Sequence, residues 1–478
     1  MLNRMSWVVV FLAWSGGALG EEVRWLGLEE AIGLALERNR DLAVGGRGVD
    51  RAELGVEAAA SEFGLQWSPD GNAGVAKGGD SWQYGLRVAR PTRWGTEVSG
   101  GGRFRSEGRD EEEGRREFTA WDVRVAQPLF RRAGRLVNEE GVMQARQGVR
   151  AALRQVEAAK AGLVIEVVET FERIRVLEEQ IEGDVRALER ARRLAALTEA
   201  RERQGRASAV DVLRVDLLRG EAEARLASSR ERLDVGRRSL AELVGARPDV
   251  VFRLEEPVRL ALELPGTEEA VRLALANRLD YGQRFDGIED ARRGERIARR
   301  ELWPDVSVVG QVSWLSGDVE EEDWFVGLTT GAGYSARRQR NEVARSRLEV
   351  VDAVDQMENL ALVIARQVQQ QMTAYGSAQV EAEIEERNFV VAMRREELAR
   401  RMFEAGRGDH GSVTDAEDQL TQASIRRLNA RARASVSGYR LLWVMGLLID
   451  SPAELKAPLD AAERGRDVVW RSEGAGAR

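Results

Sequence analysis

Two long tracts of the chain carry apolar residues at the spacing of a helix. Neither tract, 129–247 or 305–451, contains a proline, which would disrupt a helix interior. In the first tract, from about residue 135 to 203, apolar residues recur three, four and seven positions apart, at Leu153, Val156, Leu163, Val167, Ile174, Leu177, Ile181, Val185, Leu188 and Ala195. Such steps form one stripe that packs against neighbouring helices. A matching run spans about 337–407, and at 1.5 Å per residue each predicted helix is about 100 Å long.

Each predicted long helix ends at a turn that contains glycine. The turn holds Gly205 in the first tract and Gly406-Arg407-Gly408 in the second. A further helical stretch follows each turn, over about 208–245 and 412–449. The pattern therefore predicts two long helical hairpins, one in each half of the chain.

Ahead of each hairpin the apolar period changes from helical spacing to strict alternation. In the first half Trp82, Tyr84, Leu86 and Val88 alternate with polar or small residues, and the alternation extends from about 65 to 127. The second half repeats it at Val306, Val308, Val312, Trp314, Trp324, Val326 and Leu328. This period predicts strands with one apolar face and one small or polar face. The charged segments RSEGRDEEEGRRE and SGDVEEED, between the strands, are predicted to be turns in water.

The two halves begin with the same helical phrase. LEEAIGLALERNRDL at 28–42 and TEEAVRLALANRLDY at 267–281 match without a gap, and Asp50-Arg51-Ala52 then lies over Glu289-Asp290-Ala291. A period of about half the chain indicates internal duplication rather than an array of small repeats.

The N-terminal segment, 1–20, has the layout of a secretory signal peptide. It combines a basic start, an apolar stretch from Trp7 to Trp14, and small residues before Gly20. The alternative is an N-terminal membrane anchor. No later stretch approaches the roughly 20 apolar residues of a spanning helix, so we expect an exported protein.

The amino-acid composition excludes several kinds of binding, metal and catalytic site. The 478 residues are 32% charged and 6% aromatic, which favours long helices, and the net charge of −8 offers no basic excess for nucleic acid. There is no cysteine and one histidine, His410, which excludes disulfides, thiolate metal sites, cysteine nucleophiles and histidine-based triads. An enzyme would need a pair of carboxylates, and no such pair can be identified. We therefore expect no enzyme, no metal and no cofactor.

The strands favour a membrane barrel over ordinary soluble hairpins packed on helices. Their ends carry aromatic residues and one of their faces is small or polar, as in a barrel with an aromatic girdle and a wet lumen. The predicted girdle residues are Trp82, Trp94, Trp121, Trp314 and Trp324, with ordinary packing as the alternative. A few strands cannot close a barrel, and open edges are forbidden in lipid, so oligomerisation is implied.

Over about residues 23–450 the chain resembles the TolC family of outer-membrane efflux and secretion channels. The resemblance rests on the order of four features, which are the repeated opening phrase, QPLFRRAGR at 127–135, the turn GRASAVDVL at 205–213 and its weaker counterpart GRGDHGSVTDAEDQL at 406–420. It implies a mainly α fold with β, built as a homotrimer with a β-barrel in outer-membrane lipid and a periplasmic α-barrel. It also implies a periplasmic adaptor protein and an inner-membrane transporter as partners.

The chain departs from the family in two places. The family has two strands in each half, whereas the first half here holds more alternating sequence than two strands need. The PLF phrase is also missing from the second half, where TTGAGYSARR (329–338) takes its place.

The resemblance and the patterns together divide the chain into eight segments. They are the signal peptide (1–20), the first opening helix (21–64), the first strands (65–130), the first hairpin (131–265), the second opening helix (266–303), the second strands (304–336), the second hairpin (337–450) and a flexible C-terminal tail (451–478).

The resemblance also indicates residues at the periplasmic entrance, where the family has rings of acidic side chains. Aligned on Gly406, Asp415 matches one ring position, and Ser412 stands at the other, for which the nearby Asp409 is a substitute. Glu417 and Asp418 lie further along the same helix. A ring of three carboxylates would attract cations. The alternative is an ordinary helix end with surface acids.

Other residues near the turns and junctions have simpler expected roles. Arg407 is a hypothetical gate residue that pairs with Asp415 or with an acid on a neighbouring helix. Asp211 is expected to cap its helix, and His410 to be exposed. Pro128, Leu129 and Phe130 are predicted to mark the junction of strand and helix, since proline ends a strand.

The predicted function is passive export through the exit duct of a tripartite efflux pump in the outer membrane of a Gram-negative-type cell. The exit duct of a type I protein-secretion system is an alternative in the same fold, because the inner-membrane partner chooses the cargo. A soluble periplasmic coiled-coil scaffold is the alternative of a different class, and it would fractionate with the periplasm.

Overall fold

The computed structural model describes residues 24–476, apart from 77–78, 109–114, 206–207, 248–249, 251, 256–261, 318–319, 332–334, 406 and 408–409. The predicted signal peptide (1–20) and Asp409 lie outside the described residues. Contacts divide the chain into two compact units. Unit 1 comprises Met1–Asn39, Glu166–Arg259 and Glu383–Ala432, and unit 2 comprises Arg40–Ile165, Leu260–Ala382 and Arg433–Arg478.

The two halves of the chain repeat the same opening helices. α1 (Leu28–Arg38) and α6 (Thr267–Asn277) have 11 residues each, and α2 (Arg40–Ser61) and α7 (Leu279–Arg300) have 22 each. The residue between each pair, Asn39 or Arg278, has an extended backbone that ends one helix before the next begins. The offset between the halves is 239 residues, both from Leu28 to Thr267 and from Arg40 to Leu279.

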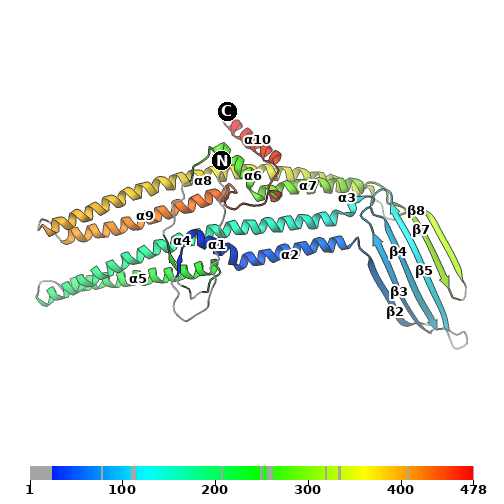
Figure 1. The fold of residues 1–478 in the computed structure, drawn as a ribbon, viewed down its shortest axis with the longest axis horizontal. Coiled ribbons are helices and arrows are strands. Elements are labelled where there is room, and N and C mark those ends of the chain that lie inside the picture. The colour runs from blue at the N-terminus through cyan, green and yellow to red at the C-terminus, as the bar shows by residue number, and fades with distance from the viewer. Residues whose placement is uncertain are drawn as a thin grey trace. The chain divides into compact units, whose positions relative to one another are not determined.

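The long hairpins predicted from the apolar stripes are present in both halves (Figure 1). The first consists of α4 (Glu140–Arg203) and α5 (Ala209–Leu243), and the second of α8 (Ala336–Glu404) and α9 (His410–Val444). α4 has 64 residues and α8 has 69. At 1.5 Å per residue they are about 96 and 104 Å long, close to the predicted length. A short helix, α3 (Arg135–Asn138), precedes α4 and breaks the continuity predicted there.

Unit 2 contains a six-stranded sheet in the order β2-β3-β4-β5-β7-β8, with every neighbouring pair antiparallel (Figure 1). The strands are β2 (Gln66–Ala76), β3 (Gly79–Pro91), β4 (Glu97–Gly108), β5 (Arg115–Pro128), β7 (Val306–Ser316) and β8 (Glu321–Thr330). The first half thus supplies four strands and the second half two. The extended alternation in the first half is explained by these two additional strands.

Unit 1 contains the first opening helix, α1, and parts of all four long helices. Phe171 and Ile174 of α4 and Leu240 of α5 are fully buried, and Gly236 lets α5 approach Ile174 closely. Further along the same hairpin, α4 and α5 share a cluster formed by Leu188, Ala222 and Leu226. A short parallel pair, β1 (Arg24–Leu26) with β6 (Phe252–Leu254), completes this unit.

The core of unit 2 contradicts the prediction of a flexible C-terminal tail. After a 3-10 turn, η1 (Ala453–Leu455), the tail forms α10 (Leu459–Gly476). Ala461, Ala462 and Val469 of this helix join the buried cluster built on α6, α7, α8 and α9. The Tyr281 hydroxyl of α7 donates a hydrogen bond of 3.1 Å to the Ala461 carbonyl. The tail was predicted to be flexible because polar residues and glycine surround these few apolar positions in the sequence.

None of the helices among the described residues combines the length and the apolar character that crossing a membrane requires.

Candidate functional site

The sheet of unit 2 has one face that is apolar across all six strands. Residues paired across a ladder point to the same side, so the register defines this face. One row runs from Trp67 through Val88, Gly100, Val123 and Val312 to Trp324. Many of its large side chains are exposed, including Trp67, Tyr84, Leu86, Val98, Trp121, Val123, Val125, Val308, Trp314, Trp324, Val326 and Leu328. We call this surface the apolar face.

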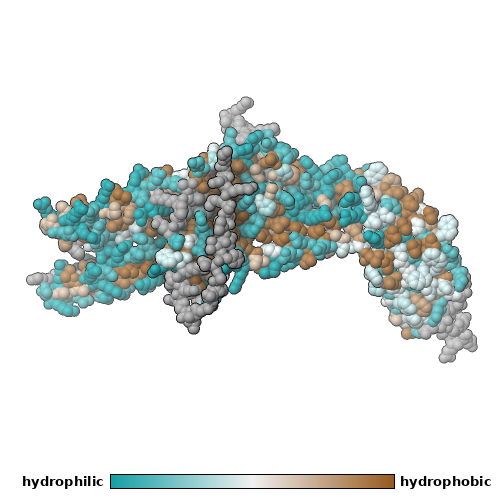
Figure 2. All heavy atoms as spheres, viewed as in Figure 1, coloured by the Kyte–Doolittle hydropathy of each residue, from teal (hydrophilic) through white to brown (hydrophobic). Residues whose placement is uncertain are grey.

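The opposite side of the sheet, the polar face, is mainly small and polar. Its neighbouring row runs from Ser68 through Arg87, Gly101, Asp122 and Ser313 to Asp323. Figure 2 shows apolar side chains gathered over parts of the sheet, while hydrophilic ones dominate the visible sides of the helices. Single exposed apolar residues are normal on soluble proteins, but a continuous apolar sheet face marks an interaction surface.

The predicted girdle tryptophans occupy different places on this sheet. Trp121 and Trp314 face each other across β5 and β7, and Trp324 of β8 is 71% exposed on the same face. The Trp121 ring lies over Gly102, where a Cβ atom would come within 2.5 Å of it. Trp82 stacks on Tyr84, at 5.7 Å between ring centroids, and also contacts Phe104. These residues form an aromatic cluster away from the helices.

Trp94 lies instead in the turn between β3 and β4, where the sheet meets the helices. There the Trp94 carbonyl accepts a hydrogen bond from the Gly134 amide, and both residues line a cavity of about 760 Å³. Trp94 is thus separated from the aromatic cluster by the length of a strand.

The predicted junction residues line this same cavity. β5 ends at Pro128, and the Leu129 amide donates to the carbonyl of Val306 at the start of β7. The Phe130 ring stacks on Trp303 with 5.8 Å between centroids. Pro128, Leu129 and Phe130 therefore lie where strands from both halves of the chain join their helices.

Among the strands that the structure describes, none pairs with the outer edge of β2 or of β8. β2 pairs with β3 and β8 pairs with β7, and these two strands stand at the ends of the strand order. An unpaired edge presents a row of backbone donors and acceptors that another strand can satisfy. The sheet is therefore an open surface with two available edges.

The turn between α8 and α9, in unit 1, carries the predicted entrance residues. Arg407 is exposed and its amide donates to the Met402 carbonyl. Asp415 is exposed on the first turns of α9, and no ion pair joins it to Arg407 among the residues that the structure describes. Arg407 and Asp415 are therefore not paired within the described chain, and pairing of Arg407 with an acid on a neighbouring helix stays a prediction.

The other predicted entrance residues near this turn have different surroundings. Asp418 forms an ion pair with Arg190 of α4, which sequence reasoning did not anticipate. The Glu417 carbonyl accepts from Thr421, and Ser412 is exposed. Asp415 thus stays exposed for the predicted ring, whereas Asp418 is held by Arg190. His410 begins α9, and its side chain lies outside the described part.

The turn between α4 and α5 is closed by a capping box. The Ser208 hydroxyl accepts from the Asp211 amide at 3.2 Å, and the Ser208 amide donates to the Asp211 carboxylate at 3.1 Å. The Ser208 hydroxyl also donates to the Asp211 carboxylate at 2.7 Å. The two hydrogen bonds that this carboxylate accepts, first from the Ser208 hydroxyl and then from the Ser208 amide, lower the pKa of Asp211. Asp211 therefore has the geometry of a helix-capping residue.

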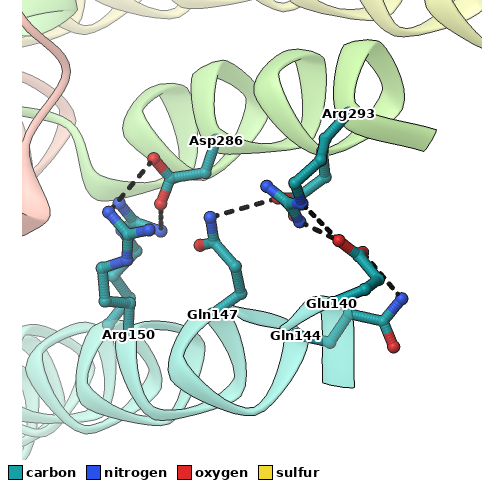
Figure 3. A network of polar contacts seen from close by, with 8 residues as sticks. Glu140, Gln144, Gln147, Arg150, Asp286 and Arg293 are labelled. Carbon is teal, nitrogen blue, oxygen red and sulfur yellow. Dashed lines mark hydrogen bonds and ion pairs between the residues drawn. The ribbon is translucent and has the colours of Figure 1, made fainter. Parts of the chain in front are cut away.

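A polar network that the sequence did not indicate joins α4 to α7 in unit 2 (Figure 3). Arg154 and Asp286, both buried, form an ion pair at 2.8 Å, and the Arg154 guanidinium also donates to the Leu455 carbonyl. Further along the two helices, Arg293 donates to Glu140 at 2.7 Å and to Asp290 at 2.6 Å. The network fixes the opening helix of the second half against the long helix of the first.

The chain is similar to known proteins in structure but not in sequence. No protein-family model matches the sequence, and no curated protein matches it significantly. The outer membrane protein VceC from Vibrio cholerae superimposes with a TM-score of 0.62 and 16% identity, over 88% of this chain and 96% of VceC. The CmeC outer membrane channel of Campylobacter jejuni gives 0.65 and 12% identity, over 92% and 89%.

The MtrE outer membrane channel of Neisseria gonorrhoeae, in its open state, gives a TM-score of 0.63 and 16% identity, over 88% of this chain and 89% of MtrE. Identities this low establish the fold. The mainly α fold with an antiparallel sheet, predicted from the resemblance to the TolC family, is thereby confirmed.

Proposed function

We propose that this chain forms a homotrimeric outer-membrane channel, the exit duct of a tripartite efflux pump that exports small molecules passively. The single observation that carries the proposal is the open sheet with its exposed apolar face. Such a face is unfavourable in water, where each Å² of apolar surface costs about 25 cal/mol. In lipid it is favourable, provided that no edge is left open.

Closure of the sheet requires further copies of the chain. Strands in a membrane must satisfy every backbone group, and only a closed barrel does so. The free edges of β2 and β8 supply the groups for this closure. Three copies are the number that the resemblance implies, with the polar face turned to a water-filled lumen.

The long helices also carry large apolar side chains that are exposed in the single chain. On α5, Val210, Leu213 and Leu217 follow helical spacing and are exposed, by 70% at Leu213. On α8, Leu348 and Val351 are likewise exposed. Neighbouring copies and a periplasmic adaptor protein are the partners that would cover these stripes. Asp415 would then recur as a ring of three carboxylates at the entrance.

Two alternatives predict different behaviour. The exit duct of a protein-secretion system has the same fold but a different inner-membrane partner, so loss of the chain would abolish secretion of a protein. An efflux duct is instead expected to give a deletion strain that is sensitive to small toxic compounds. A soluble periplasmic scaffold would be released with the periplasm, and the apolar face argues against it.

Two neighbouring residues on opposite faces of β7 provide a matched test. Val312 lies on the apolar face and Gln311 on the polar face. An arginine facing the middle of the bilayer costs roughly 2–4 kcal/mol. Val312→Arg should therefore deplete the channel from the outer membrane and sensitise cells as strongly as deletion does. Gln311→Arg should preserve assembly and export.

The proposal would be overturned if Val312→Arg assembled in the outer membrane as well as Gln311→Arg does. It would also be overturned if the unmodified protein fractionated with the soluble periplasm. In contrast, an outer-membrane trimer whose deletion left drug sensitivity unchanged but blocked protein secretion would favour the secretion duct.

A further inference from the structure

The sheet has more strands than the resemblance implies, and this changes the pore. We propose that each copy contributes six strands to the membrane barrel, with β2 of one copy paired to β8 of the next. This inference rests on the proposed trimeric channel. It would make a barrel of eighteen strands, whereas two strands per half would make one of twelve.

The β2–β3 hairpin is an integral part of the sheet rather than an appendage. β2 pairs with β3 without interruption from Gln66–Ala89 to Ala76–Gly79, and β3 pairs with β4 over eleven further positions. These ladders are as long as those between the other strands. To exclude the hairpin, the protein would have to break the β3–β4 ladder along its whole length.

The hairpin also continues both faces of the sheet. On β3, Leu86 and Val88 extend the apolar face, and on β2 the 67% exposed Trp67 extends it to the edge. Ser68 and Asn72 extend the polar face in the same way. If the hairpin lay outside the membrane, Trp67, which is in the same row across the sheet as Trp324 of β8, would be exposed to water. The alternation is the one expected of a strand between lipid and lumen.

Strand direction permits the proposed closure. Because all five neighbouring pairs are antiparallel, successive strands alternate in direction, and the first and last of six run oppositely. The β8 edge of one copy therefore meets the β2 edge of the next in antiparallel orientation. Pro69 removes one donor from β2, which an edge strand tolerates. The closed barrel has an even number of strands, all antiparallel.

The strand number determines the width of the exit. Barrel diameter grows roughly linearly with strand number, so eighteen strands give a barrel about 1.5 times as wide as twelve. Barrels of about 16–18 strands enclose an aqueous channel. The polar face, with its small residues and arginines, would line this channel. The exit would thus admit larger hydrated solutes than a barrel of twelve strands.

Disulfide trapping tests the proposed joint directly, because the chain has no cysteine of its own. Ser68→Cys or Asn72→Cys on β2 is combined with Asp323→Cys, Phe325→Cys or Thr329→Cys on β8, all on the polar face. The panel covers the possible registers of the joint. A disulfide needs Cα atoms within about 7 Å, which only adjacent strands provide. Oxidised outer membranes should then contain covalent trimers on a non-reducing gel.

Ser99→Cys on β4, with the same β8 partners, is the matched control. In the eighteen-stranded barrel, β4 and the neighbouring β8 are three strand spacings apart, about 14 Å, and no trimer should form. In a twelve-stranded barrel, β4 would be the edge strand. Covalent trimers from Ser99→Cys would therefore overturn the inference and leave the channel proposal intact.

An outer-membrane trimer in which no β2 variant can be cross-linked would likewise overturn the inference of eighteen strands and leave the channel proposal intact. A protein that is neither trimeric nor in the outer membrane would instead refute the proposed function itself.

Discussion

α2 and α7 are two versions of one 22-residue helix, and they have different surroundings. α7 buries Tyr281, Gly282, Asp286, Ile288, Arg293 and Ala298, whereas α2 buries none of its residues. α7 contacts α4 through the polar network and α8 through hydrogen bonds such as Arg284 to Gln356. α2 contacts α4, where Gly45 lies against Val156.

The residues at matching positions follow this difference. Asp286 and Arg293 of α7 correspond to Arg47 and Leu54 of α2, at the same offset of 239 residues. Arg293 is 9% exposed and Leu54 is 62% exposed. Duplication thus placed one helix inside the unit and left the other with a surface to cover. On our account, a neighbouring copy covers α2.

The largest effect is expected at the buried ion pair of α7. Asp286→Asn leaves Arg154 without its partner charge, and removing one member of a buried pair costs about 3–5 kcal/mol. Arg47→Ala, at the matching position of α2, should change stability by less than about 0.5 kcal/mol. Urea unfolding of both variants in detergent measures the contrast. Equal effects would mean that the two helices have equivalent surroundings.

A smaller effect is expected at Leu54, and it should appear in assembly rather than in folding. Burying a leucine stabilises an interface by about 1.5–3 kcal/mol. Leu54→Glu should therefore lower the yield of trimer on a native gel, while its helix content by circular dichroism stays unchanged. Leu54→Ile serves as the conservative control and should assemble. An unchanged trimer yield for Leu54→Glu would show that no copy covers α2.

A third prediction concerns Tyr281 of α7, whose contribution to stability should depend on pH. Tyr281→Phe removes the hydrogen bond to Ala461 and should cost about 1 kcal/mol. Burial raises the pKa of Tyr281 to about 12, above its ordinary value of 10.0. The folded state therefore favours the neutral phenol, and this contribution is lost as pH rises from about 10 to 12. The stability difference between the two proteins should shrink over that range, and a constant difference would contradict this.

The smallest effect concerns the first hairpin, whose turn is capped. Ser208→Ala removes the capping box of α5 and should cost about 1 kcal/mol, confined to the first turn. Hydrogen exchange of the amides near Asp211 should accelerate. Ser228→Ala, at an exposed position in the middle of α5, should leave that exchange unchanged. Equal protection in both variants would show that packing, not the cap, holds this turn.

Helices and duplication could be predicted from the sequence because their signals are local. The apolar stripes of α4 and α8 and the repeated opening phrase are visible in the chain alone. β2 is different, because Pro69, Asp70 and Gly71 are residues typical of turns. Only its pairing with β3 makes this segment a strand. The number of strands therefore depended on contacts that the sequence does not display.

The buried charged residues of α4 and α7 could not be predicted from the sequence for a related reason. Arg154, Asp286 and Arg293 read as the solvated face of a helix, and the sequence does not show that another helix covers them. The sequence did not predict α10 because few of its positions are buried, and two of them, Ala461 and Ala462, are only weakly apolar. The roles of Asp415 at the entrance and of Arg407 in the gate stay predictions, since a ring of three carboxylates needs three copies of the chain.

The most direct test of the central claim is the mass of the protein extracted from the outer membrane with detergent. Light scattering corrected for bound detergent should give about three times the mass of the 53.1 kDa chain, less any cleaved leader. A protein recovered from the periplasm as a single copy, with no detergent, would contradict the claim that copies of this sheet close a barrel in lipid.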